Sequence, residues 1–579
     1  MAEKNFGRKR IWFLYFVLGA IACIFIGQLY FLQIIRGAEF RDRAEGQYKV
    51  LSDPFNRNSI YFTEKDGAMV SAATLRSGFI LTINPQKIAN PEEAYKKLNG
   101  IIPLDAKISK EEFMRKAGKK DDPYEEIAHR VPEEAAQKIR EIKIAGVGLY
   151  RERWRYYPGE NSASHVLGFV GYKDDGKTLA GRYGLERYYD DVLNKNNGKP
   201  GRNFFAEVFS SAKSVIDPSL KTKGDIVLTI EPTVQSLLEK KLEEIKTKYR
   251  SGVTGGIIMN PKTGEIYAMS AAPRFNPNDV SHEKDVSVFN NPLVEGVYEM
   301  GSIVKPLAMA AALDAGSITP ETTYNDDLGY VMMDGKKISN YDGKGRGQNI
   351  PMQKILNDSL NTGMVFVMKK MGRESFSKYM LSYDMGQETS IDLPGEVPGL
   401  MNNLLHGTRE VEYATAAFGQ GIAMTPIEIT KALASLGNGG ILVNPHLLKK
   451  TIYAAGVEKA NAPKEGKRIL KPETSEKITR MLVGVVDKAL LGGTVKLPNY
   501  SIAAKTGTAQ ISKGGGRGYY EDRYLHSFFG YFPAYDPKFI VFLYTYYPQG
   551  EKYASHTLTA PFMDIAKFLL TYYEVPPDR

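Results

Sequence analysis

Residues 301–310 read GSIVKPLAMA and place a serine three positions ahead of a lysine, at the start of an apolar run. The small and apolar residues from Ile303 to Leu313 predict a helix that is buried nearly all round, with Pro306 in its first turn. Ser302 then lies at or near the helix N-terminus and shares a face with Lys305. A hydroxyl in that place could attack a carbonyl if Lys305 were neutral and took its proton. A simple serine N-cap would explain the same pattern.

The Ser-x-x-Lys pattern is weak by itself, because three further pairs match it: Ser210/Lys213, Ser281/Lys284 and Ser375/Lys378. Two later patterns strengthen the catalytic interpretation. Ser359-Leu360-Asn361 is the single Ser-x-Asn of the sequence, and Lys505-Thr506-Gly507 follows a strand-like run from Ser501 to Ala504. An earlier Lys-Thr-Gly, at 262–264, precedes the serine and falls in an expected hairpin turn, which is a sufficient structural explanation for it.

The ordered set Ser-x-x-Lys, Ser-x-Asn, Lys-Thr-Gly resembles the signature of penicillin-binding proteins and serine β-lactamases. The resemblance implies that Ser302 is the nucleophile that attacks a D-Ala-D-Ala peptide bond and that Lys305 is its base. Lys505 would keep Lys305 deprotonated and attract the terminal carboxylate of the substrate. Ser359 and Asn361 would carry protons and hold the peptide.

The same resemblance implies binding roles for the residues that follow Lys505. Thr506 and Thr508 would donate hydroxyl hydrogen bonds to the terminal carboxylate, and Gly507 would let the substrate backbone approach the strand edge. The oxyanion hole would consist of the N–H groups of Ser302 and Thr508. No metal and no cofactor are implied. The seven histidines of the chain are scattered, which disfavours a Ser-His-Asp triad.

Further stretches resemble the pedestal-domain and catalytic-domain motifs of class B penicillin-binding proteins: Arg155–Pro158, Ser162–Gly171, Gly181–Glu186, and Phe418–Gly421 with Thr425-Pro426. Their residue types favour packing and turns over chemistry. Two departures occur. Arg57–Phe62 only loosely matches the usual Arg-Gly-x-Ile motif, and Glu299-Met300-Gly301-Ser302 replaces the common Glu-Pro-Gly-Ser.

Ile11 to Ile35 is an uncharged run of 25 residues, long enough to cross a bilayer as a helix. Four basic residues precede it: Lys4, Arg8, Lys9 and Arg10. The positive-inside rule therefore predicts a cytoplasmic tail at 1–10, a single anchor at 11–35 and an extracytoplasmic remainder. The run ends in Gln33-Ile34-Ile35-Arg36, without a small-x-small cleavage site, so an uncleaved anchor is favoured over a signal peptide. The only cysteine, Cys23, lies within the run.

The sequence predicts two domains after the anchor. Residues 36–217 mix strand-like and charged helical stretches, which indicates a mixed α/β pedestal domain. Polar, turn-rich segments at 194–203 and 217–225 mark a boundary. Residues 218–579 have strand pairs near both ends and helices between them, which predicts an α+β domain, and the resemblance implies that this is the transpeptidase domain. Its antiparallel sheet is expected to be covered by helices, with the first and last strands adjacent.

These observations predict a membrane-anchored D,D-transpeptidase that resembles the division-type, FtsI-like class B enzymes and cross-links peptidoglycan during septal synthesis. Alternatives are an elongation-type class B protein, a D,D-carboxypeptidase, a β-lactamase, a penicillin sensor and a structural pseudoenzyme. A β-lactamase is disfavoured because the usual Glu-x-x-Leu-Asn motif is missing between Ser359 and Lys505. Ten residues before the anchor are too few for a sensor's cytoplasmic output, and every catalytic residue is present, which disfavours a pseudoenzyme.

The expected partners follow from the same resemblance. They are peptidoglycan stem peptides ending in D-Ala-D-Ala, β-lactams as covalent inhibitors, a SEDS-type glycosyltransferase, other division proteins and the membrane. Nucleic acid is not expected. The net charge is +10, but lysine and arginine are mixed with acidic residues almost everywhere, and no basic stripe is present.

Overall fold

The computed structural model describes residues 55–176, 178–195, 223–453, 456–462, 465–514 and 518–579, with seven isolated positions between 13 and 28. These residues form two compact units. Unit 1 contains Leu75–Trp154, and unit 2 contains Arg57–Thr74, Arg155–Lys195 and the described residues from 223 onward. The expected anchor at 11–35 lies almost entirely outside the described residues, as does the domain boundary expected between 217 and 218. No helix built from described residues has the length and apolarity that a bilayer crossing requires.

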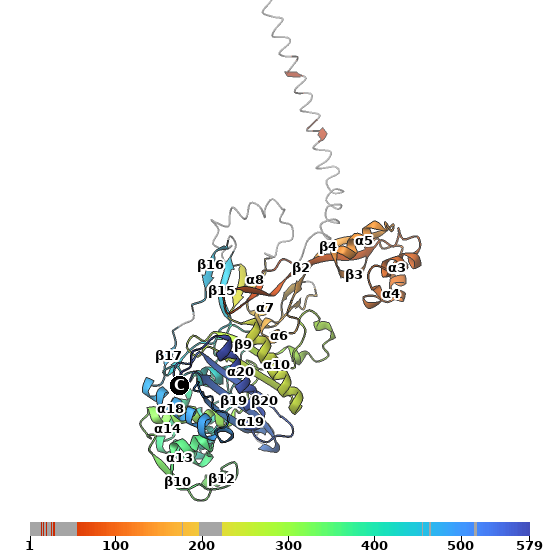
Figure 1. Cartoon of the computed structure of the whole chain (residues 1–579). Coiled ribbons are helices and arrows are strands. Elements are labelled where there is room, and N and C mark those ends of the chain that lie inside the picture. The colour runs from red at the N-terminus through yellow and green to blue at the C-terminus, as the bar shows by residue number, and fades with distance from the viewer. Residues whose placement is uncertain are drawn as a thin grey trace, which may run out of the picture. The chain divides into compact units, whose positions relative to one another are not determined.

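Unit 1 is a small α/β layer (Figure 1). Strand β2 (Met69–Ile83) begins in unit 2 and continues into unit 1, where it pairs with β3 (Glu125–Val131) and β4 (Val147–Tyr156). Helices α3 (Pro91–Asn99), α4 (Lys110–Ala117) and α5 (Glu133–Glu141) accompany these strands. Their apolar faces bury a common core that includes Leu81, Leu98 and Phe113. The helical and strand stretches expected in this region are confirmed.

The pedestal-type motifs belong to unit 2, where they surround one buried carboxylate. Glu186, fully buried, accepts hydrogen bonds from Nε of Arg155 (2.6 Å), from Nε of Arg57 (2.6 Å) and from the Tyr157 hydroxyl (3.2 Å). Burial alone would raise the pKa of Glu186, but the two guanidinium groups lower it below its usual value. Arg57 belongs to the stretch that matched its family motif only loosely, yet it completes this cluster.

These motifs and the residues that flank them form short elements: β1 (Ile60–Thr63), α6 (Ser164–Leu167), β5 (Val170–Tyr172), β6 (Leu179–Gly181), α7 (Gly184–Tyr188) and α8 (Asp190–Leu193). Strand β1 pairs in parallel with β7 (Gly224–Leu228). Antiparallel β15 (Leu448–Tyr453) and β16 (Glu458–Ala460) extend this sheet. Close packing requires glycine at Gly181, where a Cβ would lie 1.9 Å from the Glu186 carbonyl oxygen.

The main sheet of unit 2 has five strands in the order β18-β19-β20-β8-β9, all antiparallel. Their bounds are β8 Val253–Met259, β9 Ile266–Ala272, β18 Ala503–Ser512, β19 Tyr519–Phe532 and β20 Phe539–Tyr546. Met259 of β8 pairs with Ile540 of β20, so the first and last strand pairs of this part of the chain are adjacent. The expected α+β fold with an antiparallel sheet is confirmed.

Alternate residues of each strand face two separate cores, as the two-residue period of a strand requires. Helices α10 (Pro232–Tyr249) and α20 (Thr559–Tyr572) share one core with Phe528 and Val541 (Figure 1). Helices α11 (Lys305–Asp314), α17 (Pro426–Ala434) and α18 (Pro472–Gly484) share the other with Phe529 and Phe542. All ten residues of α11 are buried, which confirms the helix expected from its uninterrupted apolarity.

The remaining elements lie mostly between α11 and β18. The strands are β10 Thr323–Asp326, β11 Tyr330–Met333, β12 Lys336–Ser339, β13 Gly347–Pro351, β14 Ile441–Leu442 and β17 Lys467–Arg468. The helices are α12 Met352–Asn357, α13 Asn361–Met371, α14 Arg373–Ser382, α15 Asn402–Leu405, α16 Glu410–Ala416 and α19 Ala554–Thr557. The short helical turns are η2 Leu104–Ala106, η4 Val280–His282, η5 Val286–Phe289, η6 Gly301–Val304, η8 Val485–Ala489 and η9 Leu490–Gly493. Strand β10 pairs with β13 and β11 with β12.

Candidate active site

Ser302 lies in the 3-10 turn η6, directly ahead of α11. The Gly301 N–H donates to the Gly419 carbonyl oxygen (3.1 Å), and Gly301 has a φ of 63°, in the left-handed region. A Cβ at Gly301 would lie 3.1 Å from the Thr508 carbonyl oxygen, so the turn is wedged between the Gly419 loop and β18. The half-buried Ser302 hydroxyl forms no hydrogen bond to another described residue. It is therefore available to an incoming group.

Lys305 is the first residue of α11 and is completely buried. Its Nζ donates to the Ser359 carbonyl oxygen (2.5 Å) and to Asn361 Oδ1 (2.8 Å), and it lies 3.2 Å from Ser359 Oγ, whose hydroxyl can donate to a neutral amine. Burial lowers the pKa of Lys305 well below its ordinary value, and the charge of Lys505 lowers it further. Both effects favour the neutral amine, which is the form that can accept a proton.

Ser359 lies between the two lysines. Its Oγ is 3.2 Å from the Nζ of Lys305 and 3.1 Å from the Nζ of Lys505. The backbone of Ser359 is left-handed, with a φ of 55°, which a residue with a Cβ adopts only where its surroundings enforce it. Asn361 begins α13 and donates from Nδ2 to the Ser339 carbonyl oxygen (2.9 Å). The Ser-x-Asn motif is thus built around the lysine pair.

Lys505 lies on β18 and is only 3% exposed. Burial lowers the pKa of Lys505 to about 8. At neutral pH this side chain is mostly protonated, whereas Lys305 experiences both burial and the neighbouring positive charge. The pair therefore supplies one neutral amine and one cation within reach of the same hydroxyl, which suits a proton relay beside an anion-binding group.

Strand β18 positions the Lys-Thr-Gly motif and Thr508. Lys505 and Gly507 share one face, and Thr506 and Thr508 share the other. The Gly507 face packs on η6: a Cβ at Gly507 would lie 2.7 Å from the Met300 carbonyl oxygen. The Thr508 hydroxyl oxygen accepts a hydrogen bond from the Ala554 N–H (3.1 Å) and keeps its own hydrogen for donation.

β18 is also an edge strand, because within its sheet it pairs with β19 alone. An edge strand presents backbone N–H and C=O groups that an extended peptide can pair with. The arrangement can therefore hold a peptide along β18 with its carbonyl near Ser302 and its carboxylate near Lys505.

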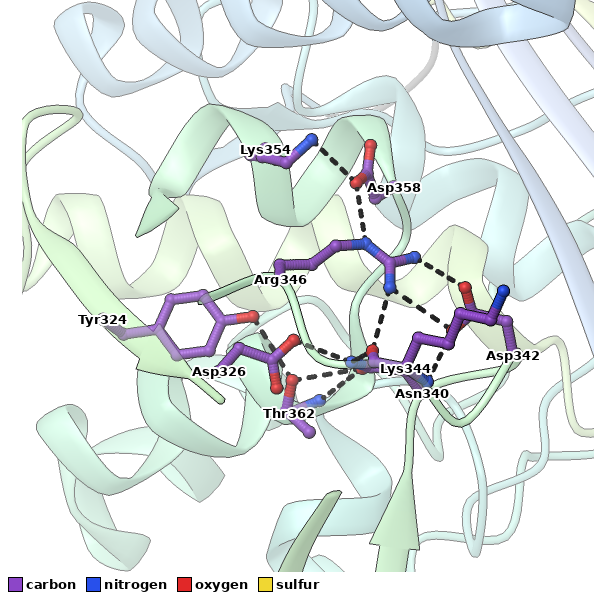
Figure 2. Close-up of polar contacts among 9 residues, drawn as sticks. All are labelled: Tyr324, Asp326, Asn340, Asp342, Lys344, Arg346, Lys354, Asp358 and Thr362. Carbon is purple, nitrogen blue, oxygen red and sulfur yellow. Dashed lines mark hydrogen bonds and ion pairs between the residues drawn. The ribbon is translucent and has the colours of Figure 1, made fainter. Parts of the chain in front are cut away.

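Sequence reasoning missed three contributions to this site. The Gly419 carbonyl holds the Ser302 turn, as described above. The Tyr519 hydroxyl donates to both carboxylate oxygens of Glu299 (3.1 and 3.0 Å), just before that turn. Asn340 and Arg346 contact the segments on either side of Ser359 (Figure 2). The only signal for the last two is a polar, glycine-rich stretch without periodicity, at 339–347.

Comparison with known families agrees with this geometry. The penicillin-binding protein transpeptidase domain matches residues 254–567, and the penicillin-binding protein dimerisation domain matches residues 63–205. Ser302, the lysine pair and the edge strand β18 all lie within the first match. The chain belongs to the penicillin-binding protein transpeptidase family, with the added dimerisation domain of the class B members.

Relatives along nearly the whole chain carry different names. Stage V sporulation protein D of Bacillus subtilis is 30% identical over 96% of this chain and 84% of the relative. Peptidoglycan D,D-transpeptidase FtsI of Buchnera aphidicola is 25% identical over 95% of this chain and 93% of the relative. Peptidoglycan D,D-transpeptidase MrdA of Acinetobacter baumannii is 28% identical over 88% of this chain and 79% of the relative. The crystal structure of penicillin-binding protein 3 from Mycobacterium tuberculosis with aztreonam is similar, with a TM-score of 0.64 and 25% identity over 74% of this chain and 92% of that one.

Proposed function

We propose that this protein cross-links peptidoglycan stem peptides through an acyl-enzyme on Ser302. The observation that carries the proposal is the placement of Ser359 Oγ between the Nζ atoms of Lys305 and Lys505, at 3.2 and 3.1 Å. Burial and the charge of Lys505 lower the pKa of Lys305 and favour its neutral form, while burial lowers the pKa of Lys505 to about 8. This is the proton relay that a serine nucleophile without histidine requires.

The proposed reaction has two halves. In the first, Ser302 Oγ bonds to the carbonyl carbon of the penultimate D-alanine while Lys305 takes the hydroxyl proton. The C–N bond to the terminal D-alanine then breaks, and the leaving nitrogen receives that proton through Ser359. In the second half, an acceptor amine attacks the ester carbonyl, loses a proton to the same relay and releases Ser302. Asn361 holds the peptide and orients Lys305.

The proposed binding roles fall on β18 and η6. The N–H groups of Ser302 and Thr508 stabilise the oxyanion that forms at the attacked carbonyl. Lys505, Thr506 and Thr508 bind the terminal carboxylate. Gly507 keeps β18 against η6 and leaves the strand edge open to the substrate backbone. β-Lactams, which carry a reactive amide and a carboxylate, would acylate Ser302 by the same route and remain attached.

The test is covalent labelling with a fluorescent penicillin, followed by peptide mapping of the adduct. We expect Ser302→Ala to abolish labelling and to keep the unfolding temperature of the wild-type protein. Ser281→Ala is a matched control, because Ser281 heads a second Ser-x-x-Lys pattern and is exposed. Labelling that survives in Ser302→Ala, or an adduct mapped to another residue, would contradict the proposal.

Product analysis separates the alternative reactions. With a pentapeptide donor and an added D-amino acid as acceptor, a transpeptidase forms the exchanged peptide. A D,D-carboxypeptidase only shortens the donor, a β-lactamase turns over penicillin, and a sensor or pseudoenzyme yields no product from the donor. We expect the exchanged peptide.

We further propose a septal role, with residues 1–10 in the cytoplasm, 11–35 as a single anchor and the domains at 36–217 and 218–579 outside. The similarity to an FtsI supports division, and the similarity to an MrdA keeps an elongation role as the second candidate. The expected partner in either case is a SEDS-type glycosyltransferase, together with other division proteins in the septal case. Septal localisation in dividing cells supports the first role, and side-wall localisation from the outset would support the second.

A further inference from the structure

Two segments that are separate in the sequence contact each other beside the Ser-x-Asn turn, and Figure 2 shows most of these contacts. One is the stretch 339–346, after β12, and the other is the turn 358–362, which contains the Ser-x-Asn motif. Asn361 Nδ2 donates to the Ser339 carbonyl oxygen (2.9 Å). The Thr362 N–H and hydroxyl both donate to Asn340 Oδ1 (3.2 and 3.1 Å). Two consecutive residues of the first segment therefore hold two consecutive residues of the second.

Asn340 is buried, and both ends of its amide are used. Its Nδ2 donates to Asp326 Oδ2 (2.9 Å) on β10 and to the Lys344 carbonyl oxygen (3.1 Å). Since the Thr362 hydroxyl donates to Asn340, the Tyr324 hydroxyl donates to Thr362 in turn (3.2 Å). Only a side chain with an acceptor and a two-hydrogen donor on one short stem satisfies these contacts.

Arg346 holds the other end of the Ser-x-Asn turn. Its Nε donates to Asp358 Oδ2 (3.1 Å), and its Nη2 donates to Asp342 Oδ2 (2.9 Å). Nη1 donates to the Lys344 carbonyl oxygen (2.8 Å), and Lys354 reaches Asp358 from α12 at 3.0 Å. Asp358 immediately precedes Ser359, whose left-handed backbone needs enforcement by its surroundings. The arginine thus bridges the 339–346 stretch to the residue before the relay serine.

We infer that Asn340 and Arg346 are positioning residues that clamp the Ser359–Asn361 turn from its two ends and so fix Ser359 Oγ and Asn361 Oδ1 on Lys305. Neither side chain forms a hydrogen bond to Lys305 or Lys505. They act through Thr362 and Asp358, and through the Ser339 carbonyl beside Asn340. This inference rests on the proposed function, since it assigns a role in the acylation of Ser302.

The test compares Asn340→Ala and Arg346→Ala with two matched controls. Arg480→Ala removes an exposed arginine ion pair with Glu476 on α18. Asn438→Ala removes an amide that bonds the backbone of Pro261 and Ile441 in the same unit. Fluorescent penicillin labelling is followed in time at several penicillin concentrations and pH values. The final amplitude reports the folded fraction, and the rate of the labelled fraction reports the chemistry.

We expect the limiting acylation rate of both clamp variants to fall ten- to a hundredfold, with little change in the concentration for half-maximal rate, because small displacements of reacting groups cost rates of about that size. We also expect a shift in how the acylation rate depends on pH: the fall in rate on acidification, which occurs when Lys305 gains a proton, should begin at a higher pH. Burial and the charge of Lys505 lower the pKa of Lys305, so water admitted by a displaced turn would raise that pKa. Arg346→Lys keeps the positive charge but loses the planar set of guanidinium N–H donors. Its limiting acylation rate should lie between those of the wild-type protein and Arg346→Ala.

The controls should keep the wild-type rate and pH profile. Clamp variants that lose amplitude or thermal stability, yet label with the wild-type rate and pH profile, would overturn the inference and leave a merely structural role. If a clamp variant does not fold, Arg346→Lys and Asp358→Asn supply the same comparison. Failure of the wild-type protein to label at Ser302 would instead reject the proposed function.

Discussion

Lys305 and Lys505 show how one residue type acquires two chemical states in one site. Both are buried, and burial alone lowers the pKa of each. The difference arises because the charge of Lys505 also acts on Lys305, which has only neutral oxygen acceptors around its Nζ. Lys505 has its own acceptors, Ser359 Oγ and the Thr506 carbonyl oxygen, and remains the cation. The position of Lys305 beside the charged Lys505 therefore makes Lys305 the first of the two lysines to lose its proton as pH rises.

This order predicts a bell-shaped dependence of penicillin acylation on pH. As pH falls, Lys305 gains a proton and can no longer accept one from Ser302. As pH rises through about 8, Lys505 loses the charge that attracts the carboxylate and keeps Lys305 neutral. Lys505→Arg keeps its charge at every pH of the assay, so we expect the alkaline limb to disappear, with a lower rate at the optimum.

The measurement is the second-order labelling constant from pH 5 to 10 for the wild-type protein and Lys505→Arg. Lys513→Arg, an exposed lysine just beyond β18, serves as the control and should keep both limbs. An alkaline limb that persists near pH 8 in Lys505→Arg would show that another group titrates there.

Strand β18 joins the proposed peptide-binding edge to the turn that carries Ser302, the proposed nucleophile. Among the described residues its outer edge has no strand partner, and its Lys505–Gly507 face packs on η6 with no room for a side chain at Gly507. A Cβ there would lie 2.3 Å from Ser527 Oγ and 2.7 Å from the Met300 carbonyl oxygen. The glycine thereby sets the distance between β18, the proposed peptide-binding strand, and Ser302, the proposed nucleophile.

We expect Gly507→Ala to push β18 away from η6. Overpacking of this kind costs about 1–3 kcal/mol of stability, and the acylation rate should fall at least tenfold because both sides of the site move apart. Gly252→Ala is the matched control, since its added Cβ would meet only ordinary contacts at 3.7 and 3.9 Å. Chemical denaturation and labelling rates check both effects. Wild-type labelling by Gly507→Ala would show that the strand spacing is not required.

Elements defined by local patterns were predictable from the sequence, and contacts between distant segments were not. The apolar run of α11, the β8–β9 hairpin, β19, β20 and α20 follow from hydrophobic periodicity and turn residues. Family-like stretches mark Gly419, Arg57 and Glu186, but nothing in the sequence indicates that Gly419 contacts Gly301, that Arg57 pairs with Glu186 or that Asn340 pairs with Thr362. Each contact depends on tertiary packing between two distant segments, and the local sequence of one segment does not indicate which other segment it contacts. The three motifs were found only because their order resembles a known family.

At the scale of the whole molecule, every residue of the proposed site lies in unit 2, separate in sequence from the proposed anchor. We expect deletion of residues 1–36 to give a soluble protein that labels with penicillin at the wild-type rate, because a domain with its own core folds without a membrane helix. The full chain should sediment with membranes and keep Met1 or Ala2 at its N-terminus. Fractionation, N-terminal sequencing and labelling check this. A mature N-terminus near residue 38 would indicate a signal peptide instead.

The pairing of β8 with β20 also has a consequence for the order of events during biosynthesis. Strand β8 is made early in unit 2 and its neighbour β20 is made near the end, so the centre of the sheet cannot close until almost the whole unit has emerged. Contacts of such high sequence separation form slowly. Ser302, Ser359 and Lys505 are therefore expected to come together late, and a partly translated chain would not yet hold the three side chains in one place. Reactivity appears only with the finished fold.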